Sequence, residues 1–195
     1  MRRGMLVCVL MLCAVCSVVS PGATSYAKQR ASQRVTGTVI GFSGRLAGRS
    51  YPFTLTVNNY SSADDAARLA AAASSQDDLL NALGKLDAGR IAVGNNVGVT
   101  ANAIFASPTA EGGTKLTVLF ERNVNLFELR YGTRSSDYRF GYAEIYLDAR
   151  GRGQGTFIPS AKVKVDGNNW VVEDFGTYPA RLMGLRSSGS VGGAR

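Results

Sequence analysis

The chain has 195 residues, with 22 Lys and Arg against 14 Asp and Glu, 45% hydrophobic residues, three Cys and no His. The absence of His excludes Ser-His and Cys-His nucleophilic dyads, a His general base and His-ligated metal sites. Because Cys8, Cys13 and Cys16 all lie near the start, the rest of the chain has no thiolate chemistry and no disulfide framework. We expect no cofactor and no metal.

The first residues have the pattern of a secretory signal peptide. Arg2 and Arg3 precede an apolar run over 5–19, which is too short to span a bilayer as a helix. The small residues Ser25 and Ala27 predict cleavage before Lys28, and an uncleaved anchor is the alternative. We therefore expect a bacterial protein that is secreted or periplasmic, with association to the cell surface as an open alternative, and with no transmembrane segment after cleavage.

Removal of residues 1–27 takes away two arginines and no acidic residue, which leaves 168 residues with a net formal charge of +6. This length suits one domain, predicted over 35–186, between a basic lead-in (28–34) and a flexible Gly/Ser tail (187–195). No acidic residue appears between Lys28 and Asp64. The triplet Asn59-Tyr60-Ser61 fits the N-glycosylation pattern, either by chance or as an acceptor in a host that glycosylates.

Alternation of apolar and polar residues predicts about eight short strands, and turn signals separate them. A segment rich in Ala, Leu, Asp and Gln (62–88) predicts two short helices, or one broken near Ser74-Ser75. Ser62 with Asp65 and Ser75 with Asp78 suggest capping boxes, and Gly89 suggests a C-cap. The glycines of 148–155 predict a break before the next strand, and 123–131 fits a strand or a helix equally. The predicted strands are 35–42, 51–57, 91–93, 97–105, 116–120, 138–147, 157–165 and 170–175.

The order of these elements predicts the fold class. No alternation of strands and helices supports a parallel sheet. We expect a mainly β (α+β) domain, either an antiparallel β-sandwich or a flattened barrel of about eight strands, with the short helical insertion at 62–88.

Aromatic residues recur at every second position of the segment 138–147. The inner face of a sheet explains this pattern best, and the single Trp170 is likewise best explained as a core residue. A second interpretation is that these residues line the inside of a barrel that encloses an apolar ligand. Alternatively, these side chains form a ligand-binding surface on which aromatic rings stack on sugars. The candidate ligand-binding residues are Tyr138, Arg139, Tyr142, Asn169 and Trp170.

Glu144 and Asp148 are the candidate catalytic residues if the protein is an enzyme. An aromatic surround could raise the pKa of Glu144, as a glycosidase acid requires, and the second carboxylate would come from Asp148, Glu128 or Glu121. A pair between Glu144 and a cross-strand Arg or Lys is the favoured alternative. The acidic, Gly-rich run 148–153 is better explained as a turn than as a calcium loop, because arginines occupy the ligand positions.

These observations favour a non-enzymatic binding or interaction module of the cell envelope. Its expected partner is an envelope polysaccharide or another anionic surface, and a signal peptide argues against nucleic acid. Two alternatives stay open, namely a carboxylate-dependent hydrolase acting on glycans and a structural or assembly subunit of the envelope. The sequence leaves the ligand and the oligomeric state undetermined.

Overall fold

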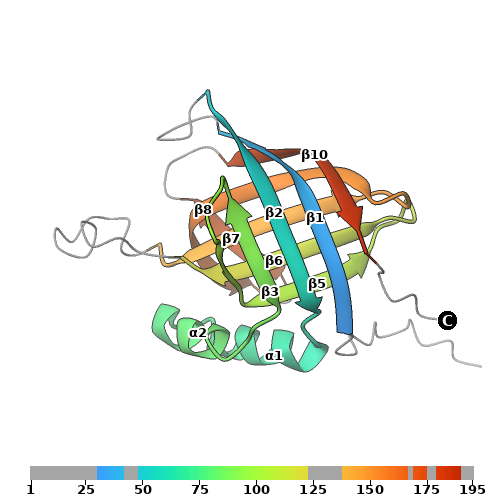
Figure 1. The fold of residues 1–195 in the computed structure, drawn as a ribbon. Helices are drawn as coiled ribbons and strands as arrows, with labels where there is room; N and C mark the ends of the chain where they lie inside the picture. Colours follow the sequence, from blue (N-terminus) through green and yellow to red (C-terminus); the bar gives the residue numbers. More distant parts are fainter. Residues whose placement is uncertain (1–29, 42–47, 123–137, 167–168, 175–178, 190–195) are drawn as a thin grey trace, which may run out of the picture.

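The structure is a computed structural model that describes residues 30–41, 48–122, 138–166, 169–174 and 179–189. The predicted signal peptide, the ambiguous segment 123–131, the predicted turn at 132–137 and the end of the predicted tail lie outside these residues. Within them, an antiparallel sheet curves around a common interior, and two helices lie across one side of it (Figure 1). The predicted mainly β fold with a short helical insertion is confirmed.

Burial alternates along the strand Ser50–Asn59, as its sequence pattern predicted. The predicted strand 97–105 is two strands, Val99–Ala101 and Ala103–Pro108, and no strand was predicted over Ala180–Ser188. Helices α1 (Ala63–Ala72) and α2 (Gln76–Leu83) follow β2 and are separated at Ser74-Ser75, as predicted. The strands are β1 (Arg30–Ile40), β2 (Ser50–Asn59), β3 (Gly89–Val93), β4 (Val99–Ala101), β5 (Ala103–Pro108), β6 (Thr114–Glu121), β7 (Phe140–Leu147), β8 (Arg152–Asp166), β9 (Asn169–Asp174) and β10 (Ala180–Ser188).

The strand order makes the sheet barrel-like. Neighbouring strands run in the order β4-β3-β2-β1-β10-β8-β7-β6-β5, all pairs are antiparallel, and β9 is added as a partner of β8. β4 and β5 stand at the two ends of this path, yet only Asn102 separates them in the chain. The two ends of the sheet are therefore joined covalently at Asn102.

Asn102 holds this junction with both polar atoms of its side-chain amide. Its Oδ1 accepts a hydrogen bond from the Glu121 backbone N–H (2.9 Å), and its Nδ2 donates to the Leu86 carbonyl (3.1 Å). The residue is 6% exposed, so water cannot readily replace these partners. At Asn102 the chain passes from β4, which pairs with β3, to β5, which pairs with β6. The side chain thus ties β6 and the segment after α2 to this junction.

Side chains that point inward form the main core. Phe157 belongs to it, and its ring meets Phe53 edge to face (centroids 6.5 Å apart) and stacks on Phe120 (6.1 Å). Each such ring or aliphatic side chain contributes about 1.5–3 kcal/mol on full burial. Other buried members of this core are Val35, Val39, Leu55, Val57, Ile91, Ile104, Leu116, Val118, Ile145, Leu182 and Leu185.

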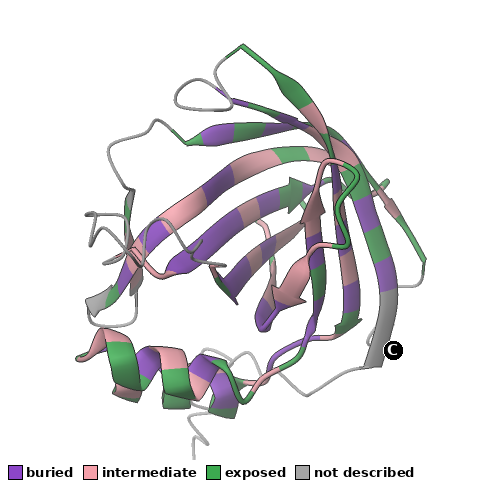
Figure 2. Ribbon diagram, turned by 60° about the vertical axis from the view of Figure 1, so that its left-hand side comes forward, coloured by how far each residue is buried: buried purple, intermediate pink, exposed green. Residues whose placement is uncertain are grey.

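A second core lies outside the barrel, between the helices and the outer face of β5 to β8 (Figure 2). Leu79 and Leu83 of α2 and Leu69 of α1 pack here with Leu119 and Phe140. Leu80 and Leu86 also pack against this core. The helical insertion therefore covers outward-facing strand residues that would otherwise be exposed.

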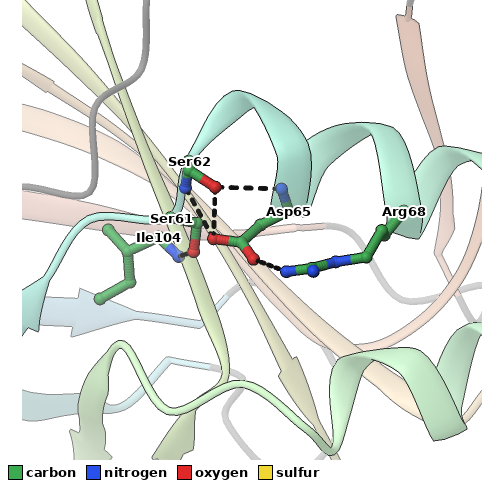
Figure 3. A network of polar contacts seen from close by, with 5 residues as sticks. All are labelled: Ser61, Ser62, Asp65, Arg68 and Ile104. Carbon is green, nitrogen blue, oxygen red and sulfur yellow. Dashed lines mark hydrogen bonds and ion pairs between the residues drawn. The ribbon is translucent and has the colours of Figure 1, made fainter.

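The start of α1 is a capping box, as predicted (Figure 3). Ser62 Oγ accepts from the Asp65 N–H (3.1 Å), and Asp65 Oδ2 accepts from the Ser62 N–H (2.8 Å) and hydroxyl (2.9 Å). Asp65 also forms an ion pair with Arg68. Burial raises the Asp65 pKa, but these hydrogen bonds and the Arg68 charge outweigh it, so the pKa lies below its usual value.

Replacing Asp65 with alanine is expected to lower the free energy of unfolding by about 1–2 kcal/mol at pH 7. Because the folded-state pKa is depressed, the carboxylate's contribution is complete above the unfolded pKa of about 3.9 and declines as the pH falls through the lower folded value. The difference between the two proteins in urea unfolding should therefore shrink below about pH 4. Asp64→Ala, in the same turn but exposed, is the control. An equal loss in both variants would show that the box is not responsible.

Two glycine predictions are wrong. Helix α2 ends at Gly84, whereas Gly89 begins β3, where a Cβ would lie 2.0 Å from the Thr56 carbonyl oxygen. The predicted break over 148–155 ends at Gly151, because β8 already starts at Arg152. Gly153 and Gly155 instead allow β8 to approach β7, since added Cβ atoms would lie 1.7 and 2.3 Å from backbone oxygens of β7.

The first and last strands pair directly. Arg34 is opposite Ser188, so the paired strands extend beyond the predicted limits 35–186 at both ends. A buried hydrogen-bond chain crosses this seam: the Tyr60 hydroxyl donates to Gln33 Oε1, and Gln33 Nε2 donates to Ser187 Oγ (2.7 Å). Gln33 is 2% exposed, and its side-chain amide is satisfied at both ends.

Candidate functional site

The predicted aromatic face of 138–147 lies on the outside of the barrel, so the prediction that it is the inner face is wrong. The inner face of β7 carries Ala143, Ile145 and Leu147, which belong to the main core. Phe140 and Tyr142 are nevertheless buried, because the second core covers their end of the strand. Tyr146, at the other end, is 43% exposed.

Glu144 lies between two tyrosines and a lysine on this outer face. Lys115 Nζ is 2.8 Å from Glu144 Oε2, and the Tyr142 hydroxyl donates to the same oxygen (2.6 Å). The Tyr146 hydroxyl donates to Oε1, and the Lys115 ammonium lies 5.5 Å from the centroid of the Tyr146 ring. Glu144 therefore has the cross-strand lysine partner that the favoured sequence interpretation expected.

The pKa of Glu144 moves in the direction opposite to that of a general acid. Burial raises it, but the hydrogen bonds from Lys115, Tyr142 and Tyr146 together lower it below its usual value. Burial, followed by the hydrogen bond to Glu144 and its negative charge, raises the pKa of Tyr142. An aromatic surround does not hold this carboxyl protonated, because the tyrosines contribute hydroxyl donors and not only apolar rings.

The two candidate second carboxylates that the structure describes, Asp148 and Glu121, do not pair with Glu144. Asp148 lies in the β7–β8 turn, where Oδ1 accepts from the backbone N–H of Arg150 and Arg152 (2.8 Å each). Glu121 is four residues along β6 from Thr117, the residue opposite Glu144, which amounts to about 13 Å of strand. Glycosidase carboxyls are roughly 5–9.5 Å apart. Glu128 lies outside the described residues, so the described geometry does not favour the hydrolase alternative.

The five predicted ligand-binding residues are not brought together as one open surface. The Tyr138 hydroxyl donates to Glu173 Oε1 (2.9 Å), and Arg139 forms an ion pair with Asp77 of α2 (2.6 Å). Trp170 packs, partly buried, against the second core. Tyr142 is buried beside Glu144, and Asn169 begins β9, where its side chain is not among those described.

A groove of about 720 Å³ lies where the β5–β6 turn, the β7–β8 turn and β10 meet. The exposed Tyr146 forms part of its wall, and the polar side chains of Arg152 and Gln154 line it. Two carboxylates also line it, namely the exposed Glu111 of the β5–β6 turn and Asp148, whose charge is held by its own turn and by Arg152 at 3.6 Å. The groove is therefore a polar surface site with one accessible aromatic ring.

An arginine face lies beside this groove. We use the name for the outward side of β3, β2, β1 and β10, whose arginines Arg34, Arg90, Arg181 and Arg186 are exposed. None of these four strands contains Asp or Glu. Their other outward positions include the threonines Thr36, Thr38, Thr54 and Thr56 and the exposed apolar residues Ile40 and Met183.

Cross-strand register places Arg34, Arg186 and Arg152 close to one another. Arg186 is directly opposite Arg152 on β8, and Arg34 is a diagonal neighbour of Arg186. Arg90 donates to the carbonyls of Val97 and Gly98 in the β3–β4 hairpin (3.4 Å each). Within the described part of the chain, Arg34 and Arg186 have no ion pair.

Sequence reasoning missed this face because it considered strands one at a time. The gap without acidic residues between Lys28 and Asp64 was a visible signal, but its partner strands β3 and β10 come from elsewhere in the chain.

Ser61, the last residue of the N-glycosylation pattern at 59–61, has a structural role. It is buried, and its Oγ accepts a hydrogen bond from the Ile104 N–H (3.1 Å).

No family model, curated protein or solved structure matches the chain. Neither described helix is long and apolar enough to cross a membrane. Among the residues that the structure covers, no group of three acidic or cysteine side chains could hold a metal ion. Function must therefore be argued from the surfaces just described.

Proposed function

We propose that this protein is a non-enzymatic binding domain that acts outside the cytoplasm and recognises an acidic polysaccharide of the cell envelope. The arginine face is the observation that carries this proposal. Its four strands present exposed arginines and no carboxylate, so an anionic chain laid across them meets attraction and no fixed negative charge.

The pairing of Arg186 with Arg152 supports a binding role over a purely structural one. Like charges directly opposite each other on a sheet are destabilising by a few tenths of a kcal/mol to about 1 kcal/mol. Asp148, at 3.6 Å from Arg152, compensates one of the two charges only in part. An anionic group bound between them would relieve this repulsion.

The groove supports a sugar polymer over a simple anion. The 43% exposed ring of Tyr146 offers a face for stacking, while Gln154 and Arg152 offer polar contacts to hydroxyl or acidic groups. Met183 and Arg152 line the groove, and both border the arginine face. One polymer could therefore place a sugar ring in the groove and its next acidic groups on the arginines.

The predicted location and the net charge agree with this partner. The sequence predicts a secretory signal over 1–27 and a net formal charge of +6 for the remaining residues. Acidic polymers of the envelope are what a cationic exported domain encounters.

The test is binding of residues 28–195 to dextran sulfate and to uncharged dextran of the same length, and sedimentation with isolated envelope material, at low and high salt. We expect binding to dextran sulfate and envelope that weakens as salt is added, and no binding to dextran. Arg34→Gln with Arg186→Gln should weaken it about 3- to 30-fold, as expected for the loss of two exposed charge contacts. Tyr146→Ala should weaken envelope binding without changing the salt dependence.

Lys85→Gln with Lys162→Gln removes the same charge from sites off the arginine face and is the matched control. Arg186→Gln should also raise the free energy of unfolding of the free protein by about 0.2–1 kcal/mol, because it removes the repulsion from Arg152. Equal losses in the control and in the arginine variant would mean that only net charge matters. Absence of binding to both materials at low salt would overturn the proposal.

A further inference from the structure

A separate apolar pocket lies at the end of the barrel beneath the β3–β4 hairpin. It has a volume of about 370 Å³, within the range of pockets that hold small organic ligands. It is distinct from the groove, because the two share no lining residue among those described. The described residues that line it are Ile91, Val93, Asn96, Val97, Gly98, Val99, Phe120 and Phe157.

The pocket has a rigid apolar floor. Phe120 and Phe157 are 5% and 6% exposed, and their stacked rings lie 14° from parallel. Ile91, 2% exposed, completes the floor from β3. Side chains fixed in this way by the main core keep their shape without a ligand, which lowers the entropic cost of binding.

The opening is equally apolar. Val97, at the hairpin, is 83% exposed, the highest value among the exposed large hydrophobic side chains of the described chain. The hairpin carrying it is held by Arg90, which donates to the carbonyls of Val97 and Gly98. Val97 therefore exposes apolar surface to water, which is unfavourable. An apolar ligand bound in the pocket beside it would cover part of this surface.

The lining selects the chemistry of the ligand. No described lining residue is charged, and the single polar side chain is Asn96, whose Nδ2 donates to the Val93 carbonyl (3.3 Å). A charged group would lose its hydration here without gaining a partner, which opposes its binding. A flat ring or a short alkyl chain would bury apolar surface against the floor, which favours its binding.

We propose that this pocket binds an uncharged apolar small molecule, an aromatic ring system or a medium-length alkyl chain with at most one hydroxyl or carbonyl group placed near Asn96. This site is independent of the arginine face and of the polysaccharide proposed there. Its ligand carries no charge, so salt should leave its binding unchanged or strengthen it slightly.

The test uses N-phenyl-1-naphthylamine, an uncharged dye whose fluorescence rises in apolar surroundings, with residues 28–195. We expect saturable binding of one dye per chain at micromolar concentrations, insensitive to salt. Decanol should displace the dye at lower concentration than decanoate, because the carboxylate would enter without a charged partner. Salt-sensitive dye binding would point to the arginine face and overturn the assignment to the pocket.

Two variants locate the dye. Val99→Trp fills the pocket from β4 and should weaken binding at least tenfold, whereas Val171→Trp on β9 makes the same change outside it and should have no effect. Val97→Asp places a charge at the exposed opening, where folding is not at risk, and should weaken binding at least fivefold. Asn95→Asp, a neighbouring exposed position outside the lining, is its control. Absence of saturable binding, or binding that neither Val99→Trp nor Val97→Asp weakens, would refute the site.

Discussion

Replacing Asn102 with alanine is expected to lower the free energy of unfolding by about 2–5 kcal/mol, a large effect for one polar substitution. The variant removes two hydrogen bonds and leaves the Glu121 N–H and the Leu86 carbonyl without the partners they have in the folded protein. Each buried group left unpaired costs about 1–3 kcal/mol. The loss should appear as a lower urea midpoint in circular dichroism with little change in the slope of the transition.

Asn96→Ala is the matched control for this experiment. Asn96 is exposed in the β3–β4 hairpin and makes one long hydrogen bond, to the Val93 carbonyl at 3.3 Å. Its loss should change the free energy of unfolding by no more than about 0.5 kcal/mol. Similar effects of the two substitutions would mean that Asn102 does not hold the junction between β4 and β5.

Replacing Gly141 with alanine is expected to cost about 2–3 kcal/mol, because the new methyl group would collide with a core ring. Gly141 is opposite Phe120 across β6 and β7, and an added Cβ would lie 2.0 Å from Cζ of Phe120. The ring cannot stay in place, so its stacking on Phe157 would be lost. Urea unfolding measures the cost, and dye binding measures the change in the pocket that Phe120 lines.

A double-mutant cycle tests the cause. Phe120→Leu removes the part of the side chain that clashes, so the pair Gly141→Ala and Phe120→Leu should be at least 1 kcal/mol more stable than the sum of the single effects predicts. Gly84→Ala is the control, since Gly84 has right-handed helical angles and the nearest atom to its added Cβ is 3.4 Å away. If the effects of Gly141→Ala and Phe120→Leu on the free energy of unfolding are additive, the collision with the Phe120 ring is not the cause of the loss.

Local signals were sufficient for the fold class and for most of the elements. Alternation located most strands, and Ser62 with Asp65 located the start of α1, because a strand face and a capping box depend on residues close in sequence. They did not reveal β10, nor the division of the predicted strand 97–105 into β4 and β5. The same reasoning failed for Gly89, Gly153 and Gly155. These glycines are required by close approach to another strand, which turn chemistry does not reveal.

The sites depended on pairings that are distant in sequence. The tyrosines around Glu144 could be placed on one face of a strand, but Lys115 enters from β6, where its hydrogen bond and charge act with the tyrosine hydroxyls to lower the pKa of Glu144. The arginine face needs β10 beside β1, and the apolar pocket needs Phe157 beside Phe120. Nothing in a single sequence fixes those neighbours.

The seam between β1 and β10 also bears on how the chain folds. One neighbour of β1 in the sheet, β2, is close to it in sequence, but the other, β10, is far from it. The hydrogen bond between Gln33 and Ser187, for example, joins residues that are 154 positions apart. Such pairing carries a large loop-closure entropy, and sheets dominated by distant contacts fold in about milliseconds to seconds. Until Ser188 has been synthesised, one edge of β1 lacks its partner and the phenylalanine-rich interior is open to water. A nascent chain in that state is a substrate for chaperones, and any premature pairing of that edge with another strand competes with the native barrel.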